Sequence, residues 1–530
     1  MSSLLSDPEN NPRPVPASSG RERFGRNVAF AWGGYMVNVV SGFIVPRLIS
    51  DHLGQATLGI WDFSWSFIAY FGLVQLGMGN STSRYVARHR AQGDVAGLNR
   101  SVSTIAIFQR AVGFLALVLA VVSAWWLLPL FETRLGNEMG TARWILLIQG
   151  TEIALSISLA VYGSIIVGCH RWDIHNSVSA IANVLVAVGM VAVLLSGGGL
   201  PALALVHCVI TVGSAALVRR RLVKRVCPEL IIDRNLASLS TFIEQARYSI
   251  KSLTPSVANL LSNQTLSLLI VAFLGPASLA IFSRARSLMT TMRNLAAKFG
   301  MILVPIASEL QARNDRVALR ETLLATPAVI SSLVLPVLFA MGIFGNQLMR
   351  LWMGQAYVQP GLITILTVGT YATLVQEPVW SLLSGMNRHG RVAIAKLIAA
   401  FVSAALLAIG LWGLHWGLLG AALCFALPQV LVDGFITPWY ACRVVGVSKR
   451  SYLWRTFVRP LLCVVPFAVA LIAATEAASG YPVVAMSIIA VGSMISGLSY
   501  LKWLFPAVMK KYLTGALRRI MPENSVETRM

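Results

Sequence analysis

The chain has 530 residues, of which 56% are hydrophobic and only 12% are charged, and its formal net charge is +22. Soluble domains have about a quarter charged residues, and a soluble chain of this length would divide into domains joined by polar linkers. The composition therefore excludes an ordinary soluble protein and predicts an all-α protein that crosses a membrane many times.

Apolar stretches long enough to cross a hydrocarbon core, about 20 residues each, recur along nearly the whole chain, and we count about fourteen of them. In the first half they lie at roughly 28–48, 58–79, 102–129, 143–168, 177–196 and 201–218. In the second half they lie at roughly 251–274, 276–305, 323–345, 361–384, 393–413 and 416–441. Two further spans are predicted at roughly 460–478 and 481–505.

An internal repeat relates the two halves of the chain. The segment Leu53–Trp61 reappears as Leu274–Phe282, an offset of 221 residues, and Asp94 falls on Asp315 at the same offset. A period this long in a membrane chain predicts two related six-helix lobes fused head to tail, with a cleft between them of the kind in which transporters hold substrate. Because each lobe has an even number of spans, we expect both lobes to have the same membrane orientation.

The predicted domain organisation follows from this repeat. It consists of a disordered tail at 1–27, an N-terminal lobe at 28–218, a linker at 219–250, a C-terminal lobe at 251–441, two additional spans at 442–505 and a second tail at 506–530. The linker is predicted to contain a short helix at the membrane interface, with Leu236, Leu239 and Phe242 on one face.

Basic residues gather on one side of the predicted membrane. They follow the second, sixth, eighth, twelfth and fourteenth spans, as at Arg84, Arg88, Arg90, Arg219, Arg220, Arg221, Arg313, Arg316, Lys449, Arg450, Lys510 and Lys511. Short loops rich in Lys and Arg remain in the cytoplasm, so both termini are predicted to be cytoplasmic. The same asymmetry explains the positive charge without nucleic-acid binding.

Signatures of an enzyme are missing from the sequence. The chain has no GxSxG elbow, no Walker A loop and no HExxH motif, and its longest hydrophilic connection is too short to fold as a catalytic domain. The six cysteines form no CxxC pair and have no histidine at zinc-ligand spacing, which favours structural thiols. We therefore expect no catalysis, no cofactor and no metal centre.

The informative residues are ionisable side chains inside the predicted spans. Such groups are costly at membrane depth and usually face the bundle interior or a watery cavity. They are Asp62, Arg110, Glu152, Lys251, Arg284, Arg286, Glu377 and Asp433. Asp62 and Lys251 lie near the ends of their spans, so each either reaches interfacial water or contributes to a site. Arg110 and Glu152 lie at similar depth in neighbouring spans and form either a structural ion pair or part of a ligand site.

Arg284 and Arg286 lie near the middle of one span. Two positions along a helix correspond to about 200°, so both side chains can hardly face one cavity. We expect one of them to line a lumen and the other to pair with an acid. Arginine suits phosphate because its guanidinium forms paired, charge-assisted hydrogen bonds. The excess of cations therefore favours an anionic substrate.

Short motifs along the chain resemble polysaccharide-biosynthesis flippases of the multidrug/oligosaccharidyl-lipid/polysaccharide exporter superfamily, and O-antigen flippases in particular. The motifs are Val45–Arg47, Leu53–Trp61, Leu76–Gly79, Ser83–Ala87, Gly168–Asp173 and Gly385–Arg388. Their order and spacing extend the resemblance over roughly residues 25–445. Gln75 departs from the pattern, since many relatives have an acidic residue there.

The resemblance implies a two-lobed bundle like that of the superfamily's multidrug exporters, with two extra C-terminal helices. It implies a flippase in the bacterial plasma membrane that carries an undecaprenyl-diphosphate-linked oligosaccharide to the outer leaflet by alternating access. On this expectation Arg286, Arg284, Lys251 and Arg110 line the cleft for the diphosphate and the glycan. The expected partners are the bilayer, the lipid-linked oligosaccharide and a polymerase or glycosyltransferase complex.

Two other functions fit the same sequence. An ion-coupled multidrug exporter would need acidic groups to dominate the cleft, and Asp62, Glu152, Glu377 and Asp433 are the candidates for that role. A scaffold without transport activity, within a polysaccharide synthase complex, is the second alternative.

Overall fold

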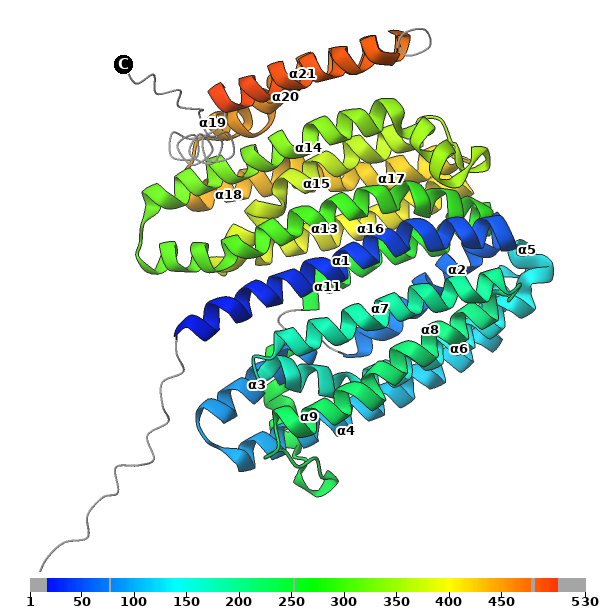
Figure 1. Ribbon diagram of the computed structural model, residues 1–530, viewed down its shortest axis with the longest axis vertical. Helices are drawn as coiled ribbons and strands as arrows, with labels where there is room; N and C mark the ends of the chain where they lie inside the picture. The colour runs from blue at the N-terminus through cyan, green and yellow to red at the C-terminus, as the bar shows by residue number, and fades with distance from the viewer. Residues whose placement is uncertain (1–16, 76–77, 251–252, 478–481, 504–530) are drawn as a thin grey trace, which may run out of the picture. The chain divides into compact units, whose positions relative to one another are not determined.

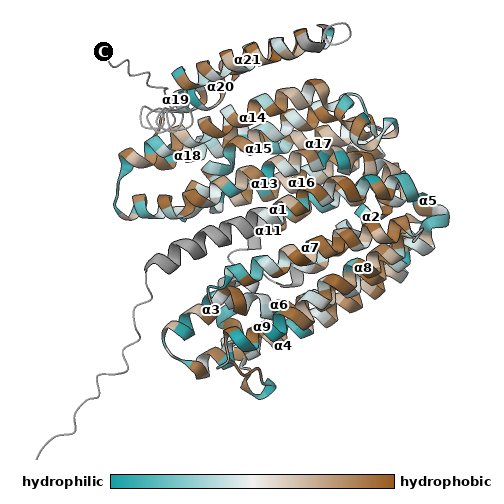
Figure 2. Cartoon of the chain, viewed as in Figure 1, coloured by the Kyte–Doolittle hydropathy of each residue, from teal (hydrophilic) through white to brown (hydrophobic). Residues whose placement is uncertain are grey.

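A computed structural model of the protein describes residues 17–75, 78–250, 253–477 and 482–503, and every element in these ranges is helical (Figure 1). Eleven helical stretches in the described part are long and apolar enough to cross a membrane, and one of them, Val95–Gly168, contains two predicted spans. Figure 2 shows that hydrophobic residues follow these helices along most of their length. The all-α, multi-span fold class is thus confirmed, whereas the count of fourteen stays a prediction.

The helices group into two compact units. The first consists of residues 1–52, 71–127 and 143–251, and the second of residues 53–70, 128–142 and 252–530. Residues 53–70, which the repeat assigns to the N-terminal lobe, thus pack with the second unit. The lobe boundaries expected from the repeat stay predictions.

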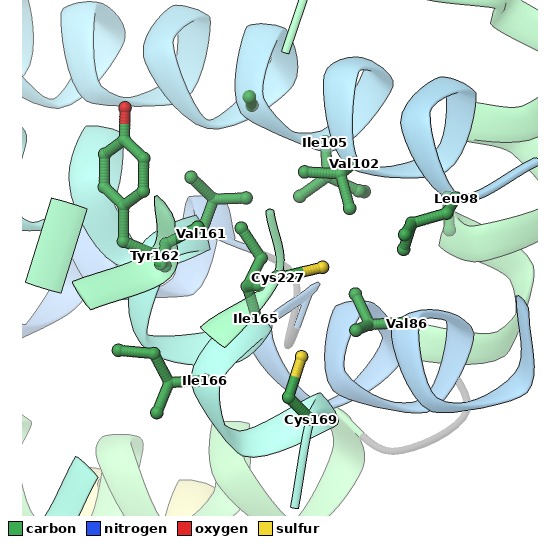
Figure 3. Close-up of a cluster of buried hydrophobic side chains, with 13 residues drawn as sticks. Val86, Leu98, Val102, Ile105, Val161, Tyr162, Ile165, Ile166, Cys169 and Cys227 are labelled. Carbon is green, nitrogen blue, oxygen red and sulfur yellow. The ribbon is translucent and has the colours of Figure 1, made fainter. Parts of the chain in front are cut away.

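The first unit is built on a core where five of its helices meet. Its helices are α1 (Ala17–Leu53), α3 (Met78–Ala91), α4 (Val95–Val122), α6 (Met139–Gly168), α7 (Trp172–Leu195), α8 (Leu200–Gly213), α9 (Arg220–Val226) and α10 (Leu239–Ile250). The five that meet at the core are α3, α4, α6, α9 and α10. Val86, Leu98, Ile105 and Ile165 are buried together, and Cys169 and Cys227 complete the core next to them (Figure 3).

The second unit contains the remaining helices. They are α2 (Gln55–Ile68), α5 (Glu132–Leu135), α11 (Leu253–Leu260), α12 (Leu266–Leu274), α13 (Pro276–Ala312), α14 (Arg316–Met353), α15 (Leu362–Gly385), α16 (Gly390–Trp412), α17 (Leu418–Leu431), α18 (Thr437–Val445), α19 (Lys449–Leu453), α20 (Arg459–Ala477) and α21 (Pro482–Trp503). Helix α13 packs against α2 on one side and α15 on another, so it lies at the centre of this unit.

Five predicted spans are not continuous α-helices in the described residues. The spans at 102–129 and 201–218 contain the π-helical turns Ser123–Leu127 and Ser214–Arg219. In the span at 58–79, α2 ends at Ile68 and a 3₁₀ segment, Ala69–Gln75, follows it. The spans at 251–274 and 416–441 each contain a π-helical turn, Leu261–Thr265 and Val432–Ile436. Hydrophobic periodicity locates an apolar run, but it does not show where the hydrogen-bond pattern changes within the run.

The linker helix is also corrected by the structure. Phe242 of α10 packs on Phe108 of α4, with ring centroids 4.6 Å apart, and Gln245 donates a hydrogen bond to Ser101 at 2.6 Å. Leu239 is 73% exposed, and Leu236 lies before α10 in a separate 3₁₀ turn. The three apolar residues therefore do not lie on one face of one helix; α10 uses Phe242 to pack on α4 within the first unit.

The repeat is visible in the backbone. Gly54 precedes α2 with φ 93° and ψ 164°, and Gly275 precedes α13 with φ 85° and ψ 171°. These positive φ values require glycine at both copies, because a Cβ would clash with the backbone there. The matched turns indicate that the 221-residue offset reflects one structural unit used twice.

A second matched turn joins consecutive helices in each copy. Gly93 and Asn314 both have positive φ, 66° and 52°. The next residue, Asp94 or Asp315, caps the following helix by accepting a hydrogen bond from the backbone N–H three residues later, at 2.8 and 2.9 Å. Such caps satisfy backbone donors that a helix leaves free at its start.

We predict that Gly59→Ala disrupts the packing of α2 on α13. A Cβ at Gly59 would overlap the carbonyl group of Pro276, and a backbone atom cannot be moved aside by a rotamer change. Overpacking of this kind typically costs about 1–3 kcal/mol. The Tm of the purified protein in detergent should fall, whereas Gly42→Ala in α1, where a Cβ meets no atom within 4 Å, should leave it unchanged. Equal Tm values for the two variants would contradict this packing.

Candidate substrate-binding site

Arg284 forms a locked ion pair with Asp62 inside the second unit. Its Nη2 atom donates to both Asp62 carboxylate oxygens at 2.7 Å. The two side chains are only 11% and 15% exposed. The expectation that one of the two neighbouring arginines pairs with an acid is confirmed, and Asp62 is that acid.

Arg286 points elsewhere, as the 200° separation requires. Its Nη1 atom donates to the backbone carbonyl oxygen of Asn263 at 3.1 Å, and its guanidinium lies 5.9 Å from the centre of the Phe282 ring. The residue lines a small cavity of about 30 Å³, together with Arg293, Thr373 and Gln429. Four residues of this cavity also line a larger one, so the two adjoin.

The larger cavity has a volume of about 300 Å³ and lies within the second unit. It is lined by residues of α11, α13, α15, α16, α17 and the π-helical turns Leu261–Thr265 and Val432–Ile436. Its polar and aromatic lining residues are Asn259, Ser262, Asn263, Arg293, Thr373, Glu377, Trp380, Lys396, Gln429 and Asp433. Small-molecule sites have volumes from about 300 Å³ upward, so this cavity has the size of a binding site.

Two ion pairs cross the cavity wall. Arg293 of α13 donates through Nε to Glu377 of α15 at 3.3 Å, and Lys396 of α16 lies 3.1 Å from the carboxylate of Asp433. Glu377 and Asp433 are 14% and 4% exposed, whereas Arg293 and Lys396 are 37% and 30% exposed. The acids are therefore embedded in the wall, and the cations are the more accessible members of both pairs.

Helix irregularities place these polar groups. The π turn Leu261–Thr265 follows Asn259, whose backbone and side-chain oxygens accept hydrogen bonds from Asn263, both at 2.7 Å. The π turn Val432–Ile436 contains Asp433. Pro378 follows Glu377 within α15 and removes one backbone donor there. Such interruptions inside helices often occur at functional sites, because they free backbone groups and redirect side chains.

The other predicted site residues lie elsewhere. Glu152 is buried in the first unit, where an oxygen of its carboxylate is 2.8 Å from Nδ1 of His207. Arg110 on α4 is exposed, and the ion-pair partner of Glu152 is His207 instead of Arg110. Lys251 lies outside the described residues. In the described part of the chain, no group of three or more His, Cys, Asp or Glu side chains is arranged to hold a metal ion.

Two cations of the cavity were missed in the sequence. Arg293 lies seven positions after Arg286, two helical turns along the same face, and this spacing was a usable signal. Lys396 lies close to the start of a predicted span, where a lysine usually reaches the membrane interface. The structure places it beside Asp433, which shows that its span enters the bundle with a charged residue facing inward.

We predict that Arg284→Ala destabilises the protein strongly. The substitution leaves the Asp62 carboxylate buried without its cation, which in known cases costs about 3–5 kcal/mol. The double variant Arg284→Met with Asp62→Leu removes both charges and should recover most of the loss. The measurement is Tm in detergent, with the exposed Arg350→Ala in α14 as a control for loss of one positive charge. A Tm for Arg284→Ala equal to that of the control would contradict the buried pair.

Comparison with known proteins identifies the family. The profile of the family described as "Polysaccharide biosynthesis protein" matches residues 24–311, more than half of the chain. The chain belongs to this family. It is also 22% identical over 439 residues to the uncharacterized membrane protein EpsK of Bacillus subtilis (strain 168), which covers 79% of this chain and 83% of that protein.

Solved structures show the same fold at low sequence identity. The lipid II flippase MurJ, in an inward closed conformation, matches with a TM-score of 0.67 and 12% identity, over 92% of this chain and all of that one. An inward-facing multidrug resistance MATE transporter of the MOP superfamily matches with a TM-score of 0.64 and 14% identity, over 78% of this chain and 94% of that one. The resemblance inferred from the sequence motifs is therefore confirmed.

Family and fold together describe the protein at a coarse level. It is a multi-pass membrane protein of the polysaccharide biosynthesis family, with the fold of MOP-superfamily transporters. The two solved structures that share this fold are, by their titles, a transporter and a flippase.

Proposed function

We propose that the protein is a flippase for a lipid-linked oligosaccharide, carried on undecaprenyl diphosphate from the cytoplasmic to the outer leaflet of a bacterial plasma membrane. The observation that carries this proposal is the charged, polar cavity among apolar, span-length helices of the second unit. A hydrophilic headgroup loses its hydration when it crosses the hydrocarbon core, and a cavity lined by hydrogen-bonding side chains replaces the lost contacts.

The comparisons support a flippase more than a drug exporter. MurJ is a lipid II flippase by its name, and its structure covers 92% of this chain, compared with 78–80% for the MATE structures. The polysaccharide biosynthesis family points to the same class of substrate. A substrate with a lipid part and a glycan part is consistent both with the similarity to MurJ and with the polysaccharide biosynthesis family.

Charge pairing also weakens the drug-exporter alternative. An exporter of organic cations needs acids that are free to bind them. Asp62, Glu377 and Asp433 each have an arginine or lysine partner within 3.3 Å, and Glu152 contacts His207. The acids named for cation binding are therefore already engaged, while Arg286 has no carboxylate partner among the described ion pairs.

Arg286 is the predicted diphosphate ligand that faces a cavity, and we retain it as the candidate residue that meets the substrate's anionic headgroup. We predict that Arg286→Ala and Arg286→Glu abolish surface polysaccharide in cells while the protein remains in the membrane. Arg286→Lys should keep partial function, because it retains the charge and loses the paired hydrogen bonds. Surface polysaccharide and membrane abundance are the two measurements.

Arg350→Ala is the matched control for this series, since it removes one exposed arginine at the end of α14. It should leave surface polysaccharide unchanged. Normal polysaccharide in cells with Arg286→Glu would refute the role of Arg286, and loss of protein from the membrane would point to folding instead.

We further propose that both termini are cytoplasmic. Reporter fusions after Arg90, Arg221 and Arg320 should then score as cytoplasmic, because basic loops remain on that side. Fusions near Glu138 and Gln355 should score as external. A cytoplasmic reporter at Gln355 would refute this topology and the count of spans on which it depends.

A further inference from the structure

The cations of the cavity differ from Arg284 in how tightly they are held. Arg284 makes two contacts of 2.7 Å to one carboxylate and is 11% exposed. Arg293 makes contacts of 3.3 Å to Glu377 and 3.4 Å to Asn259 and is 37% exposed. A guanidinium has five N–H donors, so Arg293 has donors in excess of these two long contacts. Arg293 can therefore donate further hydrogen bonds to a second anion without losing its contact with Glu377.

The charges around the cavity do not cancel. Three cations line the two adjoining spaces: Arg286, Arg293 and Lys396. Two carboxylates, Glu377 and Asp433, face them. The described lining therefore has a surplus of one positive charge. A single negative charge would neutralise it, whereas a diphosphate, with at least two negative charges, would leave an uncompensated anion among buried groups.

The uncharged lining fits a sugar. Asn259, Asn263 and Gln429 offer amide donors and acceptors of the kind that match sugar hydroxyl groups, and Trp380 offers an aromatic face. Thr373 lines both spaces, is 5% exposed, and its hydroxyl has no hydrogen-bond partner. A buried hydroxyl without a partner is costly, which indicates that a ligand completes its contacts.

From these observations we infer that the cavity is a subsite for one sugar unit that carries a single carboxylate, such as a uronic acid, in the transported glycan. The inference rests on the proposed function, because it names the chemical class of the headgroup. The sugar carboxylate binds Arg293 and Lys396 in addition to their resident acids, and the surplus charge of Arg286 balances it. The lipid diphosphate then lies outside this cavity, and the anionic part of the substrate that Arg286 meets is the sugar carboxylate.

The test is direct binding to the purified full-length protein in detergent, measured by saturation-transfer NMR with titration. The probes are glucuronate, glucose and inorganic pyrophosphate. We expect glucuronate to bind more tightly than glucose and pyrophosphate. Lys396→Met should weaken glucuronate binding by at least about 10-fold, since a charge-assisted hydrogen bond contributes about 1.5–3 kcal/mol. Arg350→Gln, which removes one exposed positive charge that is not part of the cavity lining, should not change it.

A second variant, Glu377→Gln, tests the surplus positive charge of the cavity lining. Its result is informative even if Lys396→Met does not fold. Glu377→Gln removes a resident acid, so Arg293 is released and the surplus rises to two positive charges. Glucuronate should bind about 3- to 10-fold more tightly, and pyrophosphate binding should improve more than glucuronate binding. A structural ion pair without a ligand role would predict weaker binding or none.

Three results would overturn the inference. The first is that glucuronate does not bind, and the second is that pyrophosphate binds the unmodified protein more tightly than glucuronate does. The third is that glucuronate binds the unmodified protein and Glu377→Gln with equal affinity. Failure here is distinct from failure of the proposed function. If glucuronate does not bind and Arg286→Ala still abolishes surface polysaccharide, the subsite is refuted and the flippase stands. If glucuronate binds as expected and Arg286→Ala cells keep their polysaccharide, the subsite is supported and the proposed role of Arg286 in transport is refuted.

Discussion

The arrangement of the second unit depends on the cost of placing a charge inside a membrane. Helix α13 carries Arg284, Arg286 and Arg293 within about three turns, and each guanidinium must find a partner because water is scarce at that depth. Arg284 takes Asp62 from α2, and Arg293 takes Glu377 from α15. The central helix is therefore joined to its neighbours on two sides by ion pairs as well as by apolar packing.

These ion pairs have different consequences for function. The Arg284–Asp62 pair is short, bidentate and nearly enclosed, so it acts as a fixed strut between α2 and α13. The pairs in the cavity are longer, and their cations are about one-third exposed. Helix interruptions coincide with the longer pairs, at Pro378 and at the π turn that contains Asp433. The second unit thus contains a tightly held ion pair between α2 and α13, and more loosely held ion pairs around the cavity.

Much of this arrangement was readable in the sequence. The two-residue spacing of Arg284 and Arg286 dictated that only one could face a cavity, and the structure agrees. Gly54 and Gly275, which are equivalent at the 221-residue offset, have nearly the same dihedral angles. Both features depend on local geometry, which a helix or a glycine turn determines by itself.

Other features depend on contacts between distant segments and could not be read locally. The partner of Asp62 lies 222 positions away, and Lys396 faces inward because of Asp433 on another helix. The π turns also escaped notice, because an extra residue in a helical turn leaves an apolar run equally apolar. The sequence pattern therefore locates the spans better than it locates the side chains that line a cavity.

The placement of α2 has a consequence for biogenesis. Gly59 of α2 contacts Pro276 at the start of α13, yet α2 leaves the ribosome long before α13 is synthesised. At about 5–20 residues per second, the delay is about 10–40 s. During this interval α2 resides in the membrane without its eventual neighbour, and the Asp62 carboxylate has not yet met Arg284. The second unit can therefore complete its packing only after the middle of the chain has been inserted, so its assembly does not follow the order of translation.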